Sequence, residues 1–348
     1  MTDAGRTAEA ILAGDRRTLA RVITWIENQE PASRPVLSAL YAHTGRAHLV
    51  GVTGSPGSGK STLVNEFAKL IRLRGGTVGI VAVDPTSPFS GGAVLGDRIR
   101  MRDLAGDAGV FIRSMASRGS LGGLARTTGE VIKVLDAAGF GTVIVETVGA
   151  GQSEVEIART AHTTVVVQAP GMGDDIQVIK AGILEVADVL VVNKADRPGA
   201  DSAVKALQMM QRLGRDGRPA MSLHRRWYDS QPRAMEWAQA LLPDLNSVDE
   251  WEPPVLQTVA ISGEGVEEVL DAIRSHWDYL QRSGELKFRE AARIERELDL
   301  LLREKLMAKL LNRTRGGEFE SMLGRLLERE IDPYTAAELL VHRGADCG

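Results

Sequence analysis

The sequence feature that most constrains the fold is segment 54–61, Gly-Ser-Pro-Gly-Ser-Gly-Lys-Ser, which follows the apolar run 49–52. A glycine-rich loop between a buried strand and a helix lets backbone N–H groups surround phosphate oxygens. Lys60 can reach the β- and γ-phosphates, and the Ser61 hydroxyl can bind Mg²⁺. The alternative is a plain turn with a solvated lysine. Such a turn would require neither the strand expected before this segment nor the helix expected after it. We therefore predict a nucleoside triphosphate site formed by Gly54, Ser55, Pro56, Gly57, Ser58, Gly59, Lys60, Ser61 and Thr62.

A second motif, Asn193-Lys194-Ala195-Asp196, follows the apolar run 189–192 and bears on the choice of base. Asp196 can accept from both N1–H and the 2-amino group of guanine, whereas adenine would leave this carboxylate unpaired. Lys194 can lie along the base, and Asn193 can link neighbouring loops. Alone, the motif could be a solvated loop pair; downstream of a phosphate loop, it favours GTP over ATP. After an expected strand at 255–259, we predict that the base is covered by Ala260, Ile261 and Ser262.

Composition excludes several kinds of partner. The 348 residues carry 42 Lys and Arg against 46 Asp and Glu, a net charge of −4, and no basic run stands out. Nucleic acid and an anionic membrane surface are therefore not expected as main partners. No apolar stretch is long enough to cross a membrane and no secretory leader is recognisable, so we expect a cytoplasmic protein. The single cysteine, Cys347, is expected to be an unremarkable terminal thiol.

The pattern along the chain predicts an α/β fold. Asp15 can cap an N-terminal helix whose apolar stripe is Leu19, Val22, Ile23 and Ile26. Apolar strands then alternate with helices, which indicates a mainly parallel sheet between helices, with the ligand at the carboxyl ends of its strands. Strands are expected at 49–52, 78–83, 111–112, 143–145, 164–168 and 189–192, with helices at 61–73, 124–138 and 153–161.

We predict a three-part division into an N-terminal helical segment (1–45), a nucleotide-binding domain (46–280) and a C-terminal helical region (281–348). Within the second part, 213–253 holds three of the five tryptophans and several arginines. This segment either packs against the domain or contacts a partner. The C-terminal stripe, which includes Leu298 and Leu302, needs a surface to bury it, and we favour a homodimer over folding back.

Three acidic residues are candidate magnesium ligands. Asp84 follows an expected strand and Asp97 lies where a mobile switch would be; their alternatives are a turn residue and a helix cap. Glu146 occupies the place where many GTPases have the aspartate of Asp-x-x-Gly. The N–H of Gly149 would then sense the γ-phosphate. Gln152 could orient the attacking water, or it could simply begin a helix.

Taken together, these motifs resemble the MeaB/ArgK family of P-loop GTPases, which act as chaperones of adenosylcobalamin-dependent acyl-CoA mutases such as methylmalonyl-CoA mutase. The resemblance covers roughly 5–212 and 251–345, and the extended glutamate motif is its most specific part. It rests on the phosphate loop and on Val83-Asp84-Pro85-Thr86-Ser87-Pro88, Gly96-Asp97-Arg98-Ile99-Arg100-Met101, Glu146-Thr147-Val148-Gly149-Ala150-Gly151-Gln152-Ser153-Glu154, Gly171-Met172-Gly173-Asp174-Asp175-Ile176-Gln177 and Asn193-Lys194-Ala195-Asp196.

The resemblance implies a P-loop NTPase fold, a magnesium ion near Ser61, Asp84, Asp97 and Glu146, and catalysis by Lys60, Asp97, Glu146 and Gln152. It also implies a C-terminal homodimer, a further switch at 171–180, and GTP hydrolysis coupled to cofactor loading of the mutase. Segment 213–250 is longer than the common pattern, so the identity of the mutase stays open.

Three rival functions remain. A phosphotransferase linked to amino-acid transport would need an acceptor pocket and a base, neither of which is readable in the sequence. A metallochaperone GTPase would need clustered Cys and His, and the chain has one Cys and six scattered His. An adaptor that binds GTP without hydrolysing it is the third.

Overall fold

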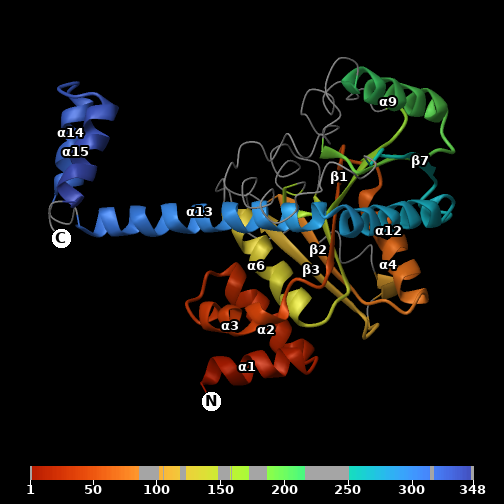
Figure 1. Cartoon of the computed structure of the whole chain (residues 1–348), viewed down its shortest axis with the longest axis horizontal. Helices are drawn as coiled ribbons and strands as arrows, with labels where there is room; N and C mark the ends of the chain where they lie inside the picture. Colours follow the sequence, from red (N-terminus) through yellow and green to blue (C-terminus); the bar gives the residue numbers. More distant parts are fainter. Residues whose placement is uncertain are drawn as a thin grey trace. The chain divides into compact units, whose positions relative to one another are not determined.

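The computed structural model describes residues 2–85, 102–104, 106–117, 123–147, 157, 159–171, 186–215, 251–313 and 317–345. Contacts divide the chain into two compact units, 1–291 and 292–348. The first unit contains the sheet and the helices that cover it, and the second is helical (Figure 1).

Within the described residues, seven strands form one sheet in the order β3-β2-β4-β1-β5-β6-β7. Every neighbouring pair runs parallel, so all carboxyl ends lie at the same edge. This confirms the predicted mainly parallel sheet. The strands are β1 His48–Gly54, β2 Val78–Pro85, β3 Val110–Ser117, β4 Thr142–Thr147, β5 Thr163–Gln168, β6 Val189–Asn193 and β7 Val255–Thr258.

Both faces of the sheet are buried because apolar residues succeed one another along each strand. Leu49 and Val143 point to one face, whereas their neighbours Val50 and Ile144 point to the other. The first face packs against α6 and the N-terminal helices, and the second packs against α4 and α12. Wholly apolar strands of this kind are typical of parallel sheets with helices on both sides. These helices are α4 Lys60–Leu73, α6 Gly123–Ala137 and α12 Val266–Ser283.

The N-terminal helices are α1 Asp3–Leu12, α2 Arg16–Glu27 and α3 Ser33–Leu40. The carboxylate of Asp15 accepts from the backbone N–H of Arg17 and so caps α2, as predicted. The hydrogen bond from the Thr18 hydroxyl, together with those from backbone N–H groups, holds the pKa of Asp15 below its usual value. The predicted apolar stripe of α2 is buried, and α2 packs against α6.

Helix α12 ends at Gly284, which adopts a left-handed conformation, and α13 (Glu285–Arg313) begins at the next residue. The first residues of α13 belong to the first unit. The second unit continues with α14 (Glu318–Leu327) and α15 (Pro333–Ala345). Asp332 accepts from the N–H groups of Tyr334 and Thr335 and so caps the start of α15.

Most expected elements are present, with small differences in length. Strand β3 is longer than the expected 111–112, because the mixed polar and apolar residues after Ile112 continue its pairing with β2. Helix α9 (Ala200–Arg215) was not singled out from the sequence; it packs against β6 and β7. The expected helix 153–161 lies largely outside the described residues, as does most of segment 213–253.

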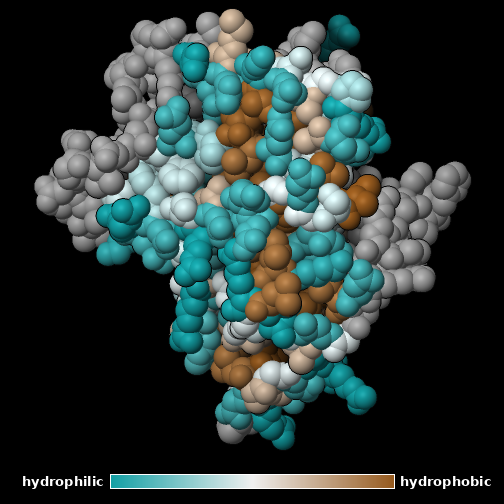
Figure 2. All heavy atoms as spheres, turned by 90° about the vertical axis from the view of Figure 1, so that its right-hand side faces the viewer, coloured by the Kyte–Doolittle hydropathy of each residue, from teal (hydrophilic) through white to brown (hydrophobic). Residues whose placement is uncertain are grey.

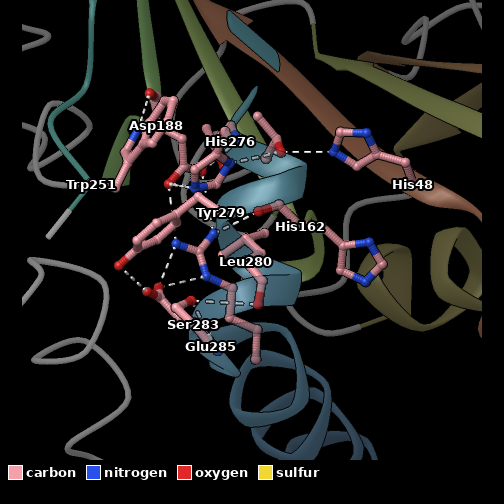
Figure 3. Close-up of polar contacts among 12 residues, drawn as sticks. His48, His162, Asp188, Trp251, His276, Tyr279, Leu280, Ser283 and Glu285 are labelled. Carbon is pink, nitrogen blue, oxygen red and sulfur yellow. Dashed lines mark hydrogen bonds and ion pairs between the residues drawn. The ribbon is translucent and has the colours of Figure 1, made fainter. Parts of the chain in front are cut away.

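At the amino-end edge of the sheet, a buried polar cluster fixes α12 and the first turn of α13 to the strands (Figure 3). Its centre is Asp188, the residue before β6, whose side chain is only 2% exposed. The carboxylate accepts from the backbone N–H of Thr164 at 2.7 Å and pairs with the Arg289 guanidinium at 3.1 Å and with His276 Nε2 at 3.2 Å. Such burial of charge is tolerated because the groups are paired and hydrogen-bonded.

His48, at the start of β1, extends this cluster. Its Nε2 lies 2.7 Å from the Thr163 hydroxyl, which is 2.9 Å from Nδ1 of His276. The His48 ring stacks on Trp277 with a centroid distance of 4.4 Å. Removal of the imidazole from water, reinforced by the nearby His276, lowers the pKa of His48 from 6.5 to about 3.

We predict that this histidine makes the fold sensitive to acid. A folded-state pKa below the unfolded value means that the unfolded chain binds more protons below pH 6.5, so the free energy of unfolding falls as pH drops from 6.5 toward 3. Between pH 6.5 and 5 the loss should be at most about 2 kcal/mol, an upper bound because the ring is partly exposed. Urea unfolding of wild type and His48→Gln at several pH values measures it.

His48→Gln should flatten this pH slope, whatever it does to stability at pH 7. His342→Gln, which changes an exposed histidine of the second unit, serves as the control and should retain the wild-type slope. Equal slopes for all three proteins would contradict the assignment.

Candidate functional site

The carboxyl-end edge of the sheet brings the predicted phosphate loop into a conformation that only glycine allows at two points. Gly54 has a φ of +133°, and a Cβ there would lie 2.0 Å from the carbonyl oxygen of Val167 on β5. Gly59 has a φ of +94°, and its Cβ would lie 2.3 Å from the side-chain nitrogen of Asn193. The loop is therefore packed tightly against β5 and against the end of β6.

Lys60 is the first residue of α4, and its side chain is 5% exposed. The ammonium donates to the carbonyl oxygens of Gly54 at 2.8 Å and of Ser55 at 2.9 Å. The ammonium thus lies beside the phosphate loop, next to the N-terminal end of α4. A buried cation and a helix N-terminus at one place favour an anionic ligand.

Ser61 and Glu146 meet in the interior next to this loop. The Ser61 hydroxyl donates to Oε1 of Glu146 at 2.6 Å, and both residues are buried. Glu146 lies near the carboxyl end of β4, paired in register with Val52 of β1, which brings it beside the phosphate loop. The next residue, Thr147, donates to the Thr53 hydroxyl at 3.0 Å, with both side chains completely buried.

These groups fit a magnesium ion, because a serine hydroxyl and a carboxylate are both oxygen ligands of the kind Mg²⁺ prefers. Within the described part of the chain, no three His, Cys, Asp or Glu side chains are grouped to hold a metal. That finding does not bear on Mg²⁺ bound with nucleotide, because this ion takes most of its ligands from phosphates and water. Asp84 is the last residue but one of β2.

Asn193 connects three loops through one side-chain amide. Its Nδ2 donates to the carbonyl oxygen of Ser58 at 2.8 Å. Its Oδ1 accepts from the backbone N–H of Ala260 and from the Thr258 hydroxyl, both at 3.0 Å. The phosphate loop, the end of β6 and the loop after β7 are therefore held in one arrangement by a residue that is 2% exposed.

The base-side residues lie at the surface next to this junction. Lys194 has a φ of +59° and donates from Nζ to the Gly57 carbonyl at 2.6 Å. Asp196 is exposed, and Ile261 is 89% exposed. The Ser262 hydroxyl donates to its own turn, at the carbonyl of Val259. The loops after β6 and β7 thus form two neighbouring walls at the carboxyl-end edge.

The structure brings together the predicted residues of the phosphate loop, Glu146, and the loops at 193–196 and 260–262. Asp97, Gly149 and Gln152 lie outside the described residues, as does the predicted switch at 171–180 beyond Gly171. Sequence reasoning missed the hydroxyl pair Thr53–Thr147 and the contact of Ser55 with Gln168 at 3.3 Å. No local pattern marks these contacts, because each joins residues that meet only when β1 is paired with β4 and β5.

Comparison with known proteins decides the family. A family model described as the methylmalonyl-CoA mutase-associated GTPase MeaB matches residues 19–315. The chain belongs to the MeaB family. A protein of Pyrococcus abyssi named as a GTPase is 45% identical over 333 residues, which cover 96% of this chain and 94% of that protein.

Two further relatives extend the comparison. GTPase ArgK of Escherichia coli is 38% identical over 278 residues, covering 79% of this chain and 76% of ArgK. The crystal structure of a protein titled LAO/AO transport system kinase matches with a TM-score of 0.65 and 28% identity, covering 98% of each chain. The predicted family and the P-loop NTPase fold are therefore confirmed, and membership in a family of GTPases supports the predicted activity class, GTP hydrolysis.

We predict that Gly59→Ala weakens GTP binding by about tenfold or more, because the new Cβ collides with Asn193 and displaces the loop. Gly75→Ala is the matched control: it has a similar positive φ of +79°, but nothing lies within 4 Å of its Cβ. Both changes carry the backbone cost of about 1 kcal/mol. Calorimetric titration with GTP should separate them, and equal affinities would show that the Gly59–Asn193 contact is unimportant.

Proposed function

We propose that this chain is a magnesium-dependent GTPase that acts as a chaperone for an adenosylcobalamin-dependent acyl-CoA mutase, methylmalonyl-CoA mutase or a relative. Hydrolysis would be coupled to loading of the cofactor and to protection of the mutase from inactivation. The observation that carries the proposal is the match to a mutase-associated GTPase family over residues 19–315. The buried meeting of Lys60, Ser61 and Glu146 beside a phosphate-binding loop supports the hydrolytic part.

We assign different roles at the triphosphate to different residues. Lys60 and the N–H groups of segment 54–62 would neutralise and position the β- and γ-phosphates. Ser61 and Glu146, with Asp84 and Asp97, would hold Mg²⁺. The ion would offset the negative charge that develops on the phosphate oxygens. Gln152 would orient the attacking water, and the Gly149 N–H would sense whether the γ-phosphate is present.

The guanine pocket would form between the loops after β6 and β7. The exposed carboxylate of Asp196 would pair with N1–H and the 2-amino group, and Ala260, Ile261 and Ser262 would cover the base. Asn193 supports this proposal because it fixes both loops to the phosphate loop through hydrogen bonds of 2.8–3.0 Å. A base pocket and a phosphate pocket joined by one amide would keep a constant spacing, which a nucleotide requires.

The helices of the second unit support a homodimer formed by the predicted region 281–348. Apolar side chains lie on the surface of α13 and α14, among them Leu298, Leu306 and Leu327, which is 83% exposed. Apolar side chains exposed in this number indicate an interaction surface. We propose a second copy of this chain as the partner there, and the mutase as the partner of the switch predicted at 171–180.

A phosphotransferase is the second candidate, and one observation favours it: the matching solved structure is titled a transport system kinase. Transfer of label from γ-labelled ATP to an acceptor would support it over the GTPase. The helices described in the structure include none long and apolar enough to cross a membrane.

We predict that Asp196→Asn shifts the base preference from guanine toward xanthine, because an amide can donate to the 2-oxo group that xanthine carries in place of the amine. The affinity for GDP should fall by about a hundredfold while that for xanthosine diphosphate rises. Asp201→Asn, on the first turn of the neighbouring α9, is the control. Unchanged preference in calorimetric titrations would show that the base binds elsewhere.

We also predict that a matching mutase raises the rate of GTP hydrolysis, since contact at 171–180 would order Gln152 or an arginine beside the γ-phosphate. Phosphate release is measured with and without the mutase, and Lys60→Ala serves as the blank. An identical rate in both conditions would remove the coupling and leave a GTPase without the proposed chaperone role.

A further inference from the structure

A cavity of about 150 Å³ lies between α4 and α12, above β1 and β4. Its floor is formed by buried apolar side chains, including Val50 and Ile144 from the strands, Phe67 from α4 and Ile273 from α12. These four are at most 3% exposed. The face of the molecule that carries α4 and α12 shows a broken band of apolar atoms between hydrophilic side chains (Figure 2).

The cavity is separate from the nucleotide site. It is lined by His48 and Thr142, the first residues of β1 and β4, whereas the phosphate loop and Glu146 lie at the opposite, carboxyl-end edge. Each of the two parallel strands therefore runs from the cavity to the nucleotide site. Helix α4 runs in the opposite direction. It begins with Lys60 at the phosphate loop and ends beside the cavity, near Arg74.

The size of the cavity limits what it can hold. A space of roughly 150 Å³ accommodates a molecule the size of benzene. The walls are held by packing, and one side of the mouth is fixed by ion pairs: Arg74 contacts both Glu267 and Asp271 of α12 at 2.7 Å. The space is thus preformed between two helices that are bridged at the surface.

The rim supplies one cation for a ligand. Arg274, on α12, lines the cavity and is exposed, and the described residues give its guanidinium no hydrogen bond or ion pair. Arg74 is already satisfied by its two carboxylates. His48 is neutral at pH 7 because burial lowers its pKa to about 3, and its ring is fixed by contacts with Thr163 and Trp277. An apolar floor and a single available guanidinium suit an amphipathic anion.

We propose that this cavity binds a small carboxylate with an aromatic or branched aliphatic body, which fills the space over Val50 and Ile144 while its carboxylate pairs with Arg274. The site is independent of the function proposed above. It lies between the two helices that begin at the phosphate loop and after the loop at 260–262. A ligand there would contact both helices at the ends remote from the nucleotide.

The test uses the full chain and benzoate as the probe, with benzyl alcohol as its neutral counterpart of similar size. Titrations followed by ligand-observed NMR should give a dissociation constant for benzoate on the order of 1 mM, as expected for so small a ligand. Arg274→Gln should weaken benzoate by about threefold, the value of an exposed ion pair, and leave benzyl alcohol unaffected. Arg282→Gln, an exposed arginine on the same helix, should bind both like wild type.

A second variant tests the cavity itself. Leu270→Phe places a larger side chain from α12 into the space and should weaken both probes, while the circular dichroism spectrum and GTP binding report that the chain is folded. The proposal is overturned if benzoate does not bind, if Arg274→Gln and Arg282→Gln behave alike, or if GTP displaces benzoate competitively. The last result would place the probe in the nucleotide site instead.

Discussion

One buried amide sets the geometry of the whole nucleotide edge. Asn193 donates to the phosphate loop and accepts from Thr258 at the end of β7 and from Ala260 just after it, so three segments that are far apart in the sequence share one arrangement. The parallel sheet makes this possible, since it delivers every strand end to the same edge. Gly59 must then lack a side chain, because the amide occupies the space that a Cβ would need. The position of Asn193 therefore determines both the spacing of these loops and the need for glycine at position 59.

Much of this edge could be predicted because its signals are local. The phosphate loop is a continuous segment whose glycines, lysine and serine have defined roles, and its strand and helix are adjacent in the chain. Asp15 was recognisable as a cap because capping depends on the next few residues only. Wholly apolar strands alternating with helices were enough to indicate a parallel sheet covered on both faces, as found. Most of the fold could therefore be predicted from local sequence patterns together with a common sheet topology.

Other features depend on contacts that no local pattern reveals. The pairing of Asp188 with Arg289 joins residues separated by 101 positions, and neither side chain stands in a motif. Thr53 and Thr147 look like ordinary strand residues until β1 and β4 are placed side by side. Strand β3 continues beyond the apolar run that ends at Ile112 because it pairs with β2 as far as Ser117. These features depend on contacts between residues that are distant in the sequence, and such contacts cannot be read from a single sequence.

The carboxylate of Asp188 has a consequence for the order in which the chain is made. It is buried between β5 and β6, yet its guanidinium partner stands in the first turn of α13, 101 residues later. While the ribosome has released the sheet but not Arg289, this carboxylate lacks that partner, and the edge of the sheet stays incomplete. The nucleotide-binding unit thus reaches its final stability only when the start of the C-terminal helix emerges. Synthesis must therefore pass residue 289 before this edge of the sheet can be completed.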